Sequence, residues 1–152
     1  SRKLWTPMHA EESALWSLDR KDGMEKAYCC FNSNARDFAR FGQLLLNNGQ
    51  WDGQQLISPA YLAEATSPDT RLVYKDLGKP NHCYGFQYWI LDYKGMKIPY
   101  MRGILGQYVF TLPEKNAVIV RLGHKRSDTY TADQHYPDDI NTWLDAAMDL
   151  LQ

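Results

Sequence analysis

The residues best suited by type and spacing to take part in a reaction lie in segment 100–113. Its sequence is Tyr-Met-Arg-Gly-Ile-Leu-Gly-Gln-Tyr-Val-Phe-Thr-Leu-Pro. Gly103 and Gly106 permit a tight bend with positive φ, which a backbone needs in order to expose amide N–H groups. Arg102 could hold a carboxylate through two parallel hydrogen bonds, and a structural arginine in a salt bridge is an equally good interpretation. We therefore predict a strand, a bend that presents amide donors, and a second strand.

A nucleophile to accompany this bend is not evident in the chain. None of the seven serines is followed by a lysine three positions later, no tyrosine precedes an asparagine by two, and Gly-x-Ser-x-Gly is absent. The four histidines show no metal-ligand spacing, and segment 124–126 (His-Lys-Arg) is interpreted as a solvated basic loop. No metal or cofactor is predicted.

Composition limits the classes of function. The 152 residues fit one domain, 1–152, with 44% hydrophobic and 23% charged residues, typical of a globular protein. A formal net charge of -1 gives no electrostatic footprint for nucleic acid. Apolar runs are too short for a membrane span. The three cysteines, two of them adjacent, are interpreted as buried small side chains, because an odd count without Cys-x-x-Cys argues against a disulfide framework or zinc site.

The bend needs a sheet to position it. Strands are predicted on both sides of the bend and again over 117–122, which gives a three-stranded antiparallel meander. An aromatic strand over 84–91 precedes it and returns over 96–102. Pro99 lies in that return strand and cannot donate to a ladder, so the strand is expected at a sheet edge.

Helices are predicted on either side of the sheet region. The first follows Asn34, which can cap it, and ends before Gly49, a suitable left-handed residue. A second begins after Ser58 with Pro59 in its first position. The last covers 138–151 and has an apolar stripe. Segment 2–26 is interpreted as loop, and 130–137 as a surface loop that overhangs the bend.

Several segments, in this order, resemble the C-terminal half of serine hydrolases of the β-lactamase and penicillin-binding superfamily. The similarity is greatest to the class C-like branch, which includes esterases, D-aminopeptidases and 6-aminohexanoate-dimer hydrolases, and it extends from about residue 5 to 151. The matching segments are Asn34-Ala-Arg-Asp-Phe-Ala-Arg-Phe-Gly, Leu44-Leu-Leu-Asn-Asn-Gly, Gln55-Leu-Ile-Ser-Pro, Tyr84-Gly-Phe-Gln-Tyr-Trp, Gly106-Gln-Tyr, Leu112-Pro-Glu-Lys-Asn and Val118-Ile-Val.

This resemblance implies a mixed α/β fold, with a five-stranded antiparallel sheet to which this half gives three strands. In such enzymes the nucleophile is the serine of Ser-x-x-Lys, and the lysine and a tyrosine of Tyr-x-Asn transfer protons. A third element on an edge strand supplies an oxyanion N–H. Arg102-Gly103-Ile104 replaces that element here. By resemblance, Gly103 lets substrate approach, the Ile104 N–H is an oxyanion donor, and Arg102 is a candidate for binding a substrate carboxylate.

The missing first two elements lie upstream of the Asn34 helix in this superfamily. We therefore expect this chain to be the C-terminal portion of a longer bacterial hydrolase that acts on a small-molecule amide or ester, and to be inactive without its N-terminal half. The alternative is a non-catalytic module that keeps the fold and binds peptide or cell wall. Strand 117–122 should have an open outer edge, which another copy of the chain could also fill. The superfamily is commonly exported to the periplasm or beyond.

Overall fold

The computed structural model describes residues 2–74, 78–132 and 135–151. The α-helices in these ranges are α1 (Ala35–Leu46), α2 (Pro59–Ala65) and α3 (Asp139–Leu150). The longer strands are β7 (Trp89–Tyr93), β8 (Met96–Arg102), β9 (Tyr108–Leu112) and β10 (Ala117–Arg121), with a 3-10 turn, η1 (Pro113–Lys115), before β10. Small hairpins pair β1 (Leu15–Trp16) with β2 (Phe31–Asn32), β3 (Gln50–Trp51) with β4 (Gln54–Gln55), and β5 (Val73–Tyr74) with β6 (Lys79–Pro80).

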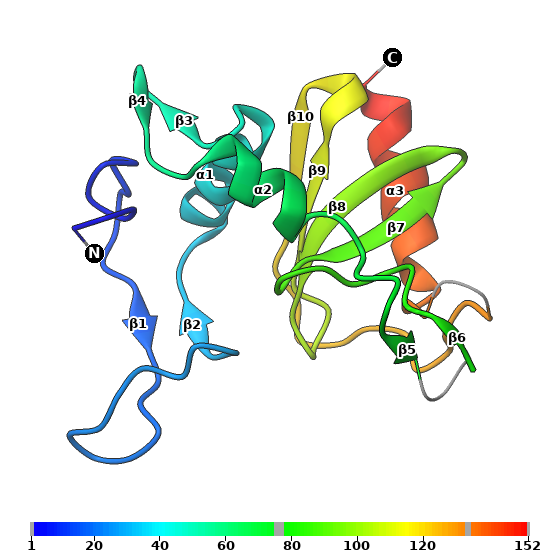
Figure 1. The fold of residues 1–152 in the computed structure, drawn as a ribbon, viewed down its shortest axis with the longest axis horizontal. Coiled ribbons are helices and arrows are strands. Elements are labelled where there is room, and N and C mark those ends of the chain that lie inside the picture. The colour runs from blue at the N-terminus through cyan, green and yellow to red at the C-terminus, as the bar shows by residue number, and fades with distance from the viewer. Residues whose placement is uncertain (1, 75–77, 133–134, 152) are drawn as a thin grey trace.

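The central sheet has four antiparallel strands in the order β10-β9-β8-β7 (Figure 1). The predicted meander has three strands, whereas the sheet in the structure has four. The fourth strand, β7, starts at Trp89, so only the last part of the predicted 84–91 strand enters the sheet. The chain turns at Lys94 and Gly95, which have φ of 51° and 86°, and the side chain of Asp92 accepts the Gly95 N–H at 2.9 Å. This tight turn aligns β7 with β8.

The prediction that segment 96–102 lies at a sheet edge is wrong, because β8 pairs with β7 on one side and β9 on the other. The reasoning about Pro99 holds only locally. Pairing with β9 is limited to Tyr100–Arg102, whereas Pro99 pairs only with Ile90 of β7. The proline thus lies in the part of an interior strand that has a single neighbour, where a missing N–H costs least.

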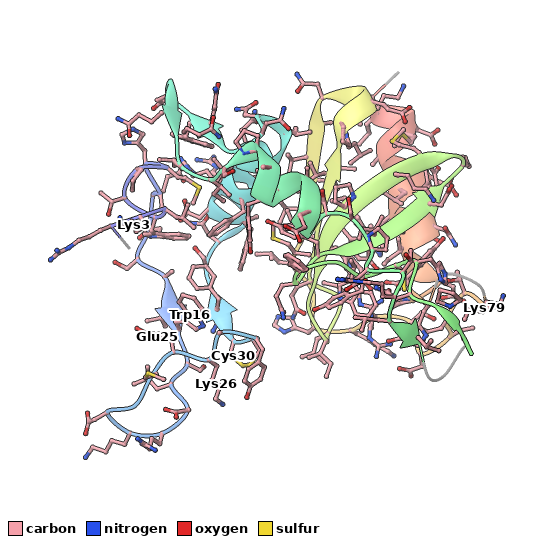
Figure 2. The ribbon with its side chains drawn as sticks, viewed as in Figure 1. Lys3, Trp16, Glu25, Lys26, Cys30 and Lys79 are labelled. Carbon is pink, nitrogen blue, oxygen red and sulfur yellow. A yellow bond between two sulfur atoms is a disulfide. The ribbon has the colours of Figure 1, made fainter. Side chains whose placement is uncertain are left out.

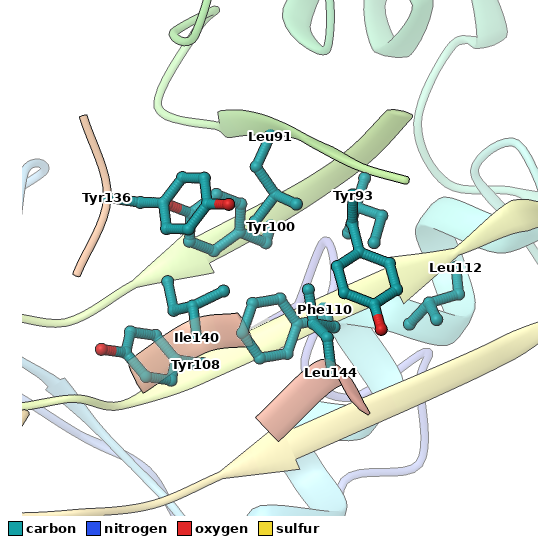
Figure 3. Close-up of a cluster of buried hydrophobic side chains, with 10 residues drawn as sticks. Leu91, Tyr93, Tyr100, Tyr108, Phe110, Leu112, Tyr136, Ile140 and Leu144 are labelled. Carbon is teal, nitrogen blue, oxygen red and sulfur yellow. The ribbon is translucent and has the colours of Figure 1, made fainter. Parts of the chain in front are cut away.

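Helix α3 covers one face of the sheet and encloses the main core (Figure 3). The rings of Tyr100, Tyr108 and Phe110 lie at the centre, with Tyr100 and Tyr108 each 5.4 Å from Phe110. Ile140 and Leu144 of α3 are fully buried against them. The predicted apolar stripe of the last helix is therefore the surface that closes this core.

Helix α1 packs on the opposite face, against β9 and β10 (Figure 1). Gly42 makes the close approach feasible, since a Cβ there would overlap the side chain of Val118 on β10. The predicted caps are confirmed: the Asn34 side chain accepts the Asp37 N–H at 2.8 Å, and Gly49 follows α1 with φ of 82°. Ser58 likewise caps α2.

Residues 13–32, here named the N-terminal arm, form a hairpin that extends away from the sheet (Figures 1 and 2). Its base is fixed by rings: Phe31 lies 5.2 Å from Trp5 and 5.3 Å from Trp16. Cys29 and Cys30 form a disulfide between neighbours, so their interpretation as buried thiols is wrong; the spacing rules did not consider adjacent cysteines. Cys83 is buried and free, as predicted. No helix in the described ranges has the length and apolar content of a membrane span.

Candidate functional site

The bend between β8 and β9 comprises residues 103–106, and three of its four amides have acceptors. Gly103 donates to the carbonyl of Gln107 at 2.8 Å, and Gly106 donates to that of Gly103 at 3.3 Å. Leu105 donates to the side-chain carbonyl of Gln107 at 3.1 Å. Within the described residues, the Ile104 N–H donates to nothing, and the residue Ile104 is 81% exposed. The bend therefore presents one uncommitted backbone donor at the surface.

Side chains from the strand and loop that follow hold the bend in place. Gln107 also donates to the carbonyl of Gly123 at 2.9 Å, so one side chain joins the bend to segment 121–126. Arg121 donates to the carbonyl of Gly106, and Arg126 donates through Nε to that of Ile104 at 3.0 Å. Through its contacts with Leu105 and Gly123, the Gln107 side chain orders the bend.

Both glycines are required by this packing. Gly106 has φ of 85°, a conformation that L side chains rarely adopt. A Cβ on Gly106 would also overlap the guanidinium of Arg121, and one on Gly103 would overlap the side chain of Gln107. The residues that flank Ile104 therefore cannot be larger without displacing the groups that hold the bend.

Arg102 lies beside the bend, stacked between rings. Its guanidinium carbon is 3.4 Å from the centroid of Trp89 and 5.9 Å from that of Tyr130. Nη1 donates to the carbonyl of His135 at 3.0 Å. No carboxylate among the described residues forms an ion pair with Arg102. Stacking occupies the faces of the guanidinium and leaves its remaining edge donors available.

Three titratable groups near Arg102 have raised pKa values. Burial raises the pKa of the Tyr100 hydroxyl, although the charge of Arg102 opposes the shift. Burial and the nearby Asp139 carboxylate raise the pKa of Tyr108. Burial also raises the pKa of the Cys83 thiol. None of these groups is therefore suited to act as a general base or a thiolate nucleophile at neutral pH.

The segment predicted to overhang the bend contacts two arginines beside it, Arg102 and Arg126. Tyr130 stacks over both Arg102 and Arg126, and the described end of the loop contributes the His135 carbonyl. Arg126, Trp89 and Tyr130 were not predicted as site residues. Arg126 reaches Ile104 across 22 positions, and no local motif signals a contact of that length. The only sequence signal at Arg126 is the basic run 124–126, which predicts a solvated loop.

The two best-defined hollows of the described structure, of about 400 and 370 Å³, lie away from the bend. The first is lined by Trp51, His9 and residues around them, and the second by Tyr93, Met148 and their neighbours. No group of three or more acidic, histidine or cysteine side chains that could hold a metal occurs in the described ranges.

The fold places the chain among mixed α/β proteins with helices on both faces of an antiparallel sheet. A solved structure of a Bacillus anthracis protein assigned as a 6-aminohexanoate-dimer hydrolase matches with a TM-score of 0.74 and 26% identity, over 99% of this chain. The 6-aminohexanoate-dimer hydrolase of Paenarthrobacter ureafaciens is 27% identical over 126 residues, 80% of this chain. No protein-family model matches.

These relatives are hydrolases, and the chain is homologous to only part of each. It spans 36% of the Bacillus anthracis protein and 32% of the Paenarthrobacter ureafaciens one. The resemblance to 6-aminohexanoate-dimer hydrolases that was inferred from the sequence is therefore confirmed by these two relatives. The structure has the mixed α/β character expected from it, with the four-stranded sheet as the correction to the predicted meander.

Proposed function

We propose that this chain is the C-terminal portion of a serine hydrolase of the β-lactamase and penicillin-binding superfamily. In this proposal the complete protein hydrolyses a small-molecule amide or ester, and its Ser-x-x-Lys and Tyr-x-Asn elements lie outside the chain. The observation that carries the proposal is the uncommitted N–H of Ile104 in a bend braced on both sides. The hydrolase names of relatives that extend well beyond the chain support it.

The proposed chemistry is acyl transfer through a serine. The serine gives its O–H proton to the lysine or tyrosine of the upstream elements as its oxygen attacks the substrate carbonyl carbon, and an electron pair of the C=O bond moves to the oxygen. The Ile104 N–H would donate to this oxyanion, while Gly103 keeps the approach clear. Collapse of the adduct re-forms the C=O bond and expels the amine or alcohol, which takes up that proton. Water then attacks the acyl-serine in the same way, which releases the acid and the free serine. A donor aimed at the developing charge contributes about 3 kcal/mol of transition-state stabilisation. The chain alone, without the nucleophile, is expected to be inactive.

Arg102 is proposed to bind a carboxylate of the substrate. Its guanidinium carbon lies 3.4 Å from the centroid of Trp89, and Nη1 donates to the His135 carbonyl and the Tyr100 hydroxyl. Among the described residues, Nε and Nη2 have no acceptor. A guanidinium fixed in this way can present two parallel donors to a carboxylate without further ordering.

The outer edge of β10 is the proposed junction with the rest of the hydrolase. Only β9 pairs with β10 in the described structure, so the other side of Ala117–Arg121 has backbone groups without strand partners. Open edges favour pairing with another strand. We propose that strands of the N-terminal half pair here; pairing between two copies of the chain is the competing arrangement.

The experiment that tests this function is covalent labelling of the protein at its full natural length with a fluorophosphonate. We expect one labelled serine, found by peptide mass spectrometry in a Ser-x-x-Lys sequence before residue 1. The isolated 152-residue chain is the matched control and should remain unlabelled. Presence of both upstream motifs without labelling would contradict the proposal and favour the non-catalytic binding module.

A further inference from the structure

Two peptide planes decide where the Ile104 N–H points. The plane between Gly103 and Ile104 carries this N–H, and its carbonyl accepts the Gly106 N–H. The plane between Ile104 and Leu105 is held at both ends: Arg126 Nε donates to its carbonyl at 3.0 Å, and Gln107 accepts its N–H at 3.1 Å. Because a peptide unit is planar and stiff, both ends move together, and only the torsions at Ile104 connect the two planes.

Arg126 is itself immobilised. Its Nη1 donates to the carbonyl of Ser127 at 2.7 Å, and its guanidinium carbon lies 5.0 Å above the ring of Tyr130. The planar guanidinium makes both hydrogen bonds and the ring contact in one orientation, which a lysine ammonium cannot reproduce. The same Tyr130 ring lies 5.9 Å from Arg102, so the loop that holds Arg126 also contacts the other proposed site residue.

We infer that Arg126 is a positioning residue that fixes the direction of the Ile104 N–H. It acts through the Ile104 carbonyl and touches no reacting atom. This role rests on the proposed function for its catalytic meaning, but the orientation of the amide is a property of the fold alone. Preorganised donors are effective only when they are aimed before the charge develops, so loss of this contact should reduce the rate of the chemical step.

The kinetic test compares three variants of the full-length protein with a short-chain p-nitrophenyl ester as the probe. Arg126→Met removes the hydrogen bonds, and Arg126→Lys keeps the charge without the planar fork. Lys125→Met removes a neighbouring exposed charge and is the matched control. We expect Arg126→Met to reduce kcat about 10- to 100-fold with little change in KM, because a misaimed group loses rate on this scale. Arg126→Lys should fall between, and Lys125→Met should match wild type.

A second readout does not depend on activity. In protein labelled with ¹⁵N-isoleucine, the Ile104 amide cross-peak is assigned by its loss in Ile104→Val. We expect Arg126→Met to shift or broaden this cross-peak while those of the other isoleucines, such as buried Ile98 and Ile140, stay in place. Lys125→Met should leave it unchanged. Unchanged positions for the buried isoleucines also show that the variant has folded; if Arg126→Met does not fold, Arg126→Lys provides the comparison.

Three outcomes would overturn the inference: an unmoved Ile104 cross-peak in Arg126→Met, an unchanged kcat, or a change confined to KM, which would indicate a binding role. Failure of the proposed function gives a different pattern, in which wild type neither turns over the ester nor reacts with fluorophosphonate. The cross-peak alone then decides whether Arg126 orients the amide.

Discussion

The sheet and the N-terminal arm differ sharply in how they bury apolar residues. On the α3 face of the sheet, Tyr100, Phe110 and Leu144 are at most 1% exposed. On the arm, Leu15, Met24 and Tyr28 are 73 to 75% exposed, although the arm is built from equally apolar residue types. The sheet completes its core within this chain, whereas the arm has apolar side chains with no core to enter. Large exposed apolar groups gathered on one element are typical of surfaces that contact a partner.

The largest expected effect comes from opening the sheet core. Phe110→Ala should lower the free energy of unfolding by about 3 to 5 kcal/mol, because it leaves a cavity among fixed rings. Met24→Ala on the arm is the control and should change it by less than about 0.5 kcal/mol. Urea denaturation followed by tryptophan fluorescence measures both. Similar costs at the two positions would show that the contrast between sheet and arm is wrong.

The bend belongs to the sheet but is expected to matter for rate rather than stability. Ile104→Pro deletes the uncommitted N–H, and kcat of the full-length protein should fall about 100- to 1000-fold, the usual cost of a lost oxyanion donor. Ile104→Val keeps the amide and should retain kcat to within about 3-fold. Equal activity in the proline and valine variants, each checked for folding by circular dichroism, would remove Ile104 from the oxyanion hole.

Local signals predicted the helices of this fold well, because capping depends on residues close together in sequence. The side chains of Asn34 and Ser58 each accept the backbone N–H of the residue three positions later and so cap their helices. Gly49 adopts the left-handed conformation expected of it. The bend was predicted for the same reason. Gly103 and Gly106 indicate that other groups pack closely against the backbone at these positions. They do not indicate which residues those groups belong to.

Long-range contacts account for what the sequence left undetermined. The stack of Arg102 on Trp89 and the bond from Arg126 to Ile104 join separate elements, and the isolated segments favour neither contact. Pro99 led to a wrong prediction of an edge strand because β8 pairs with β9 along only part of its length. The presence of a proline does not indicate how far such pairing extends along a strand. The disulfide at Cys29 was missed since the spacing rules concern cysteines that are separated in sequence.

Asp37 joins helix α1 to the segment just before the N-terminal arm, and it should make stability depend on pH. Its fully buried carboxylate accepts the Glu11 and Glu12 N–H groups, at 2.8 and 3.1 Å, and pairs with Arg40 at 3.0 Å. Burial by itself would raise the pKa of Asp37, but these N–H groups and Arg40 hold it below the ordinary value of 3.8.

Because the folded pKa is the lower one, the stabilisation by Asp37 is complete above about pH 4 and is lost as pH falls through the folded pKa. We expect Asp37→Asn to cost about 2 to 3 kcal/mol at pH 7, since it leaves Arg40 without its buried partner. The difference from wild type should shrink below pH 4. Urea denaturation at pH 7 and pH 3 measures it, and a difference that is the same at both values would contradict this role of Asp37.

The smallest expected change in unfolding free energy is for a substitution on the arm itself. It tests whether the arm stays in solvent or is buried against another part of the protein. Tyr28→Ala should change the unfolding free energy of the 152-residue chain by less than about 0.5 kcal/mol, because the ring is 73% exposed. In the full-length protein the same substitution should cost about 2 kcal/mol if the arm is buried against the proposed N-terminal half, as for other buried side chains. Lys21→Ala, on the same exposed arm, is the control for both samples. Equal small costs in the two samples would mean that the arm remains in solvent, and that the sheet edge at β10 alone joins the two halves.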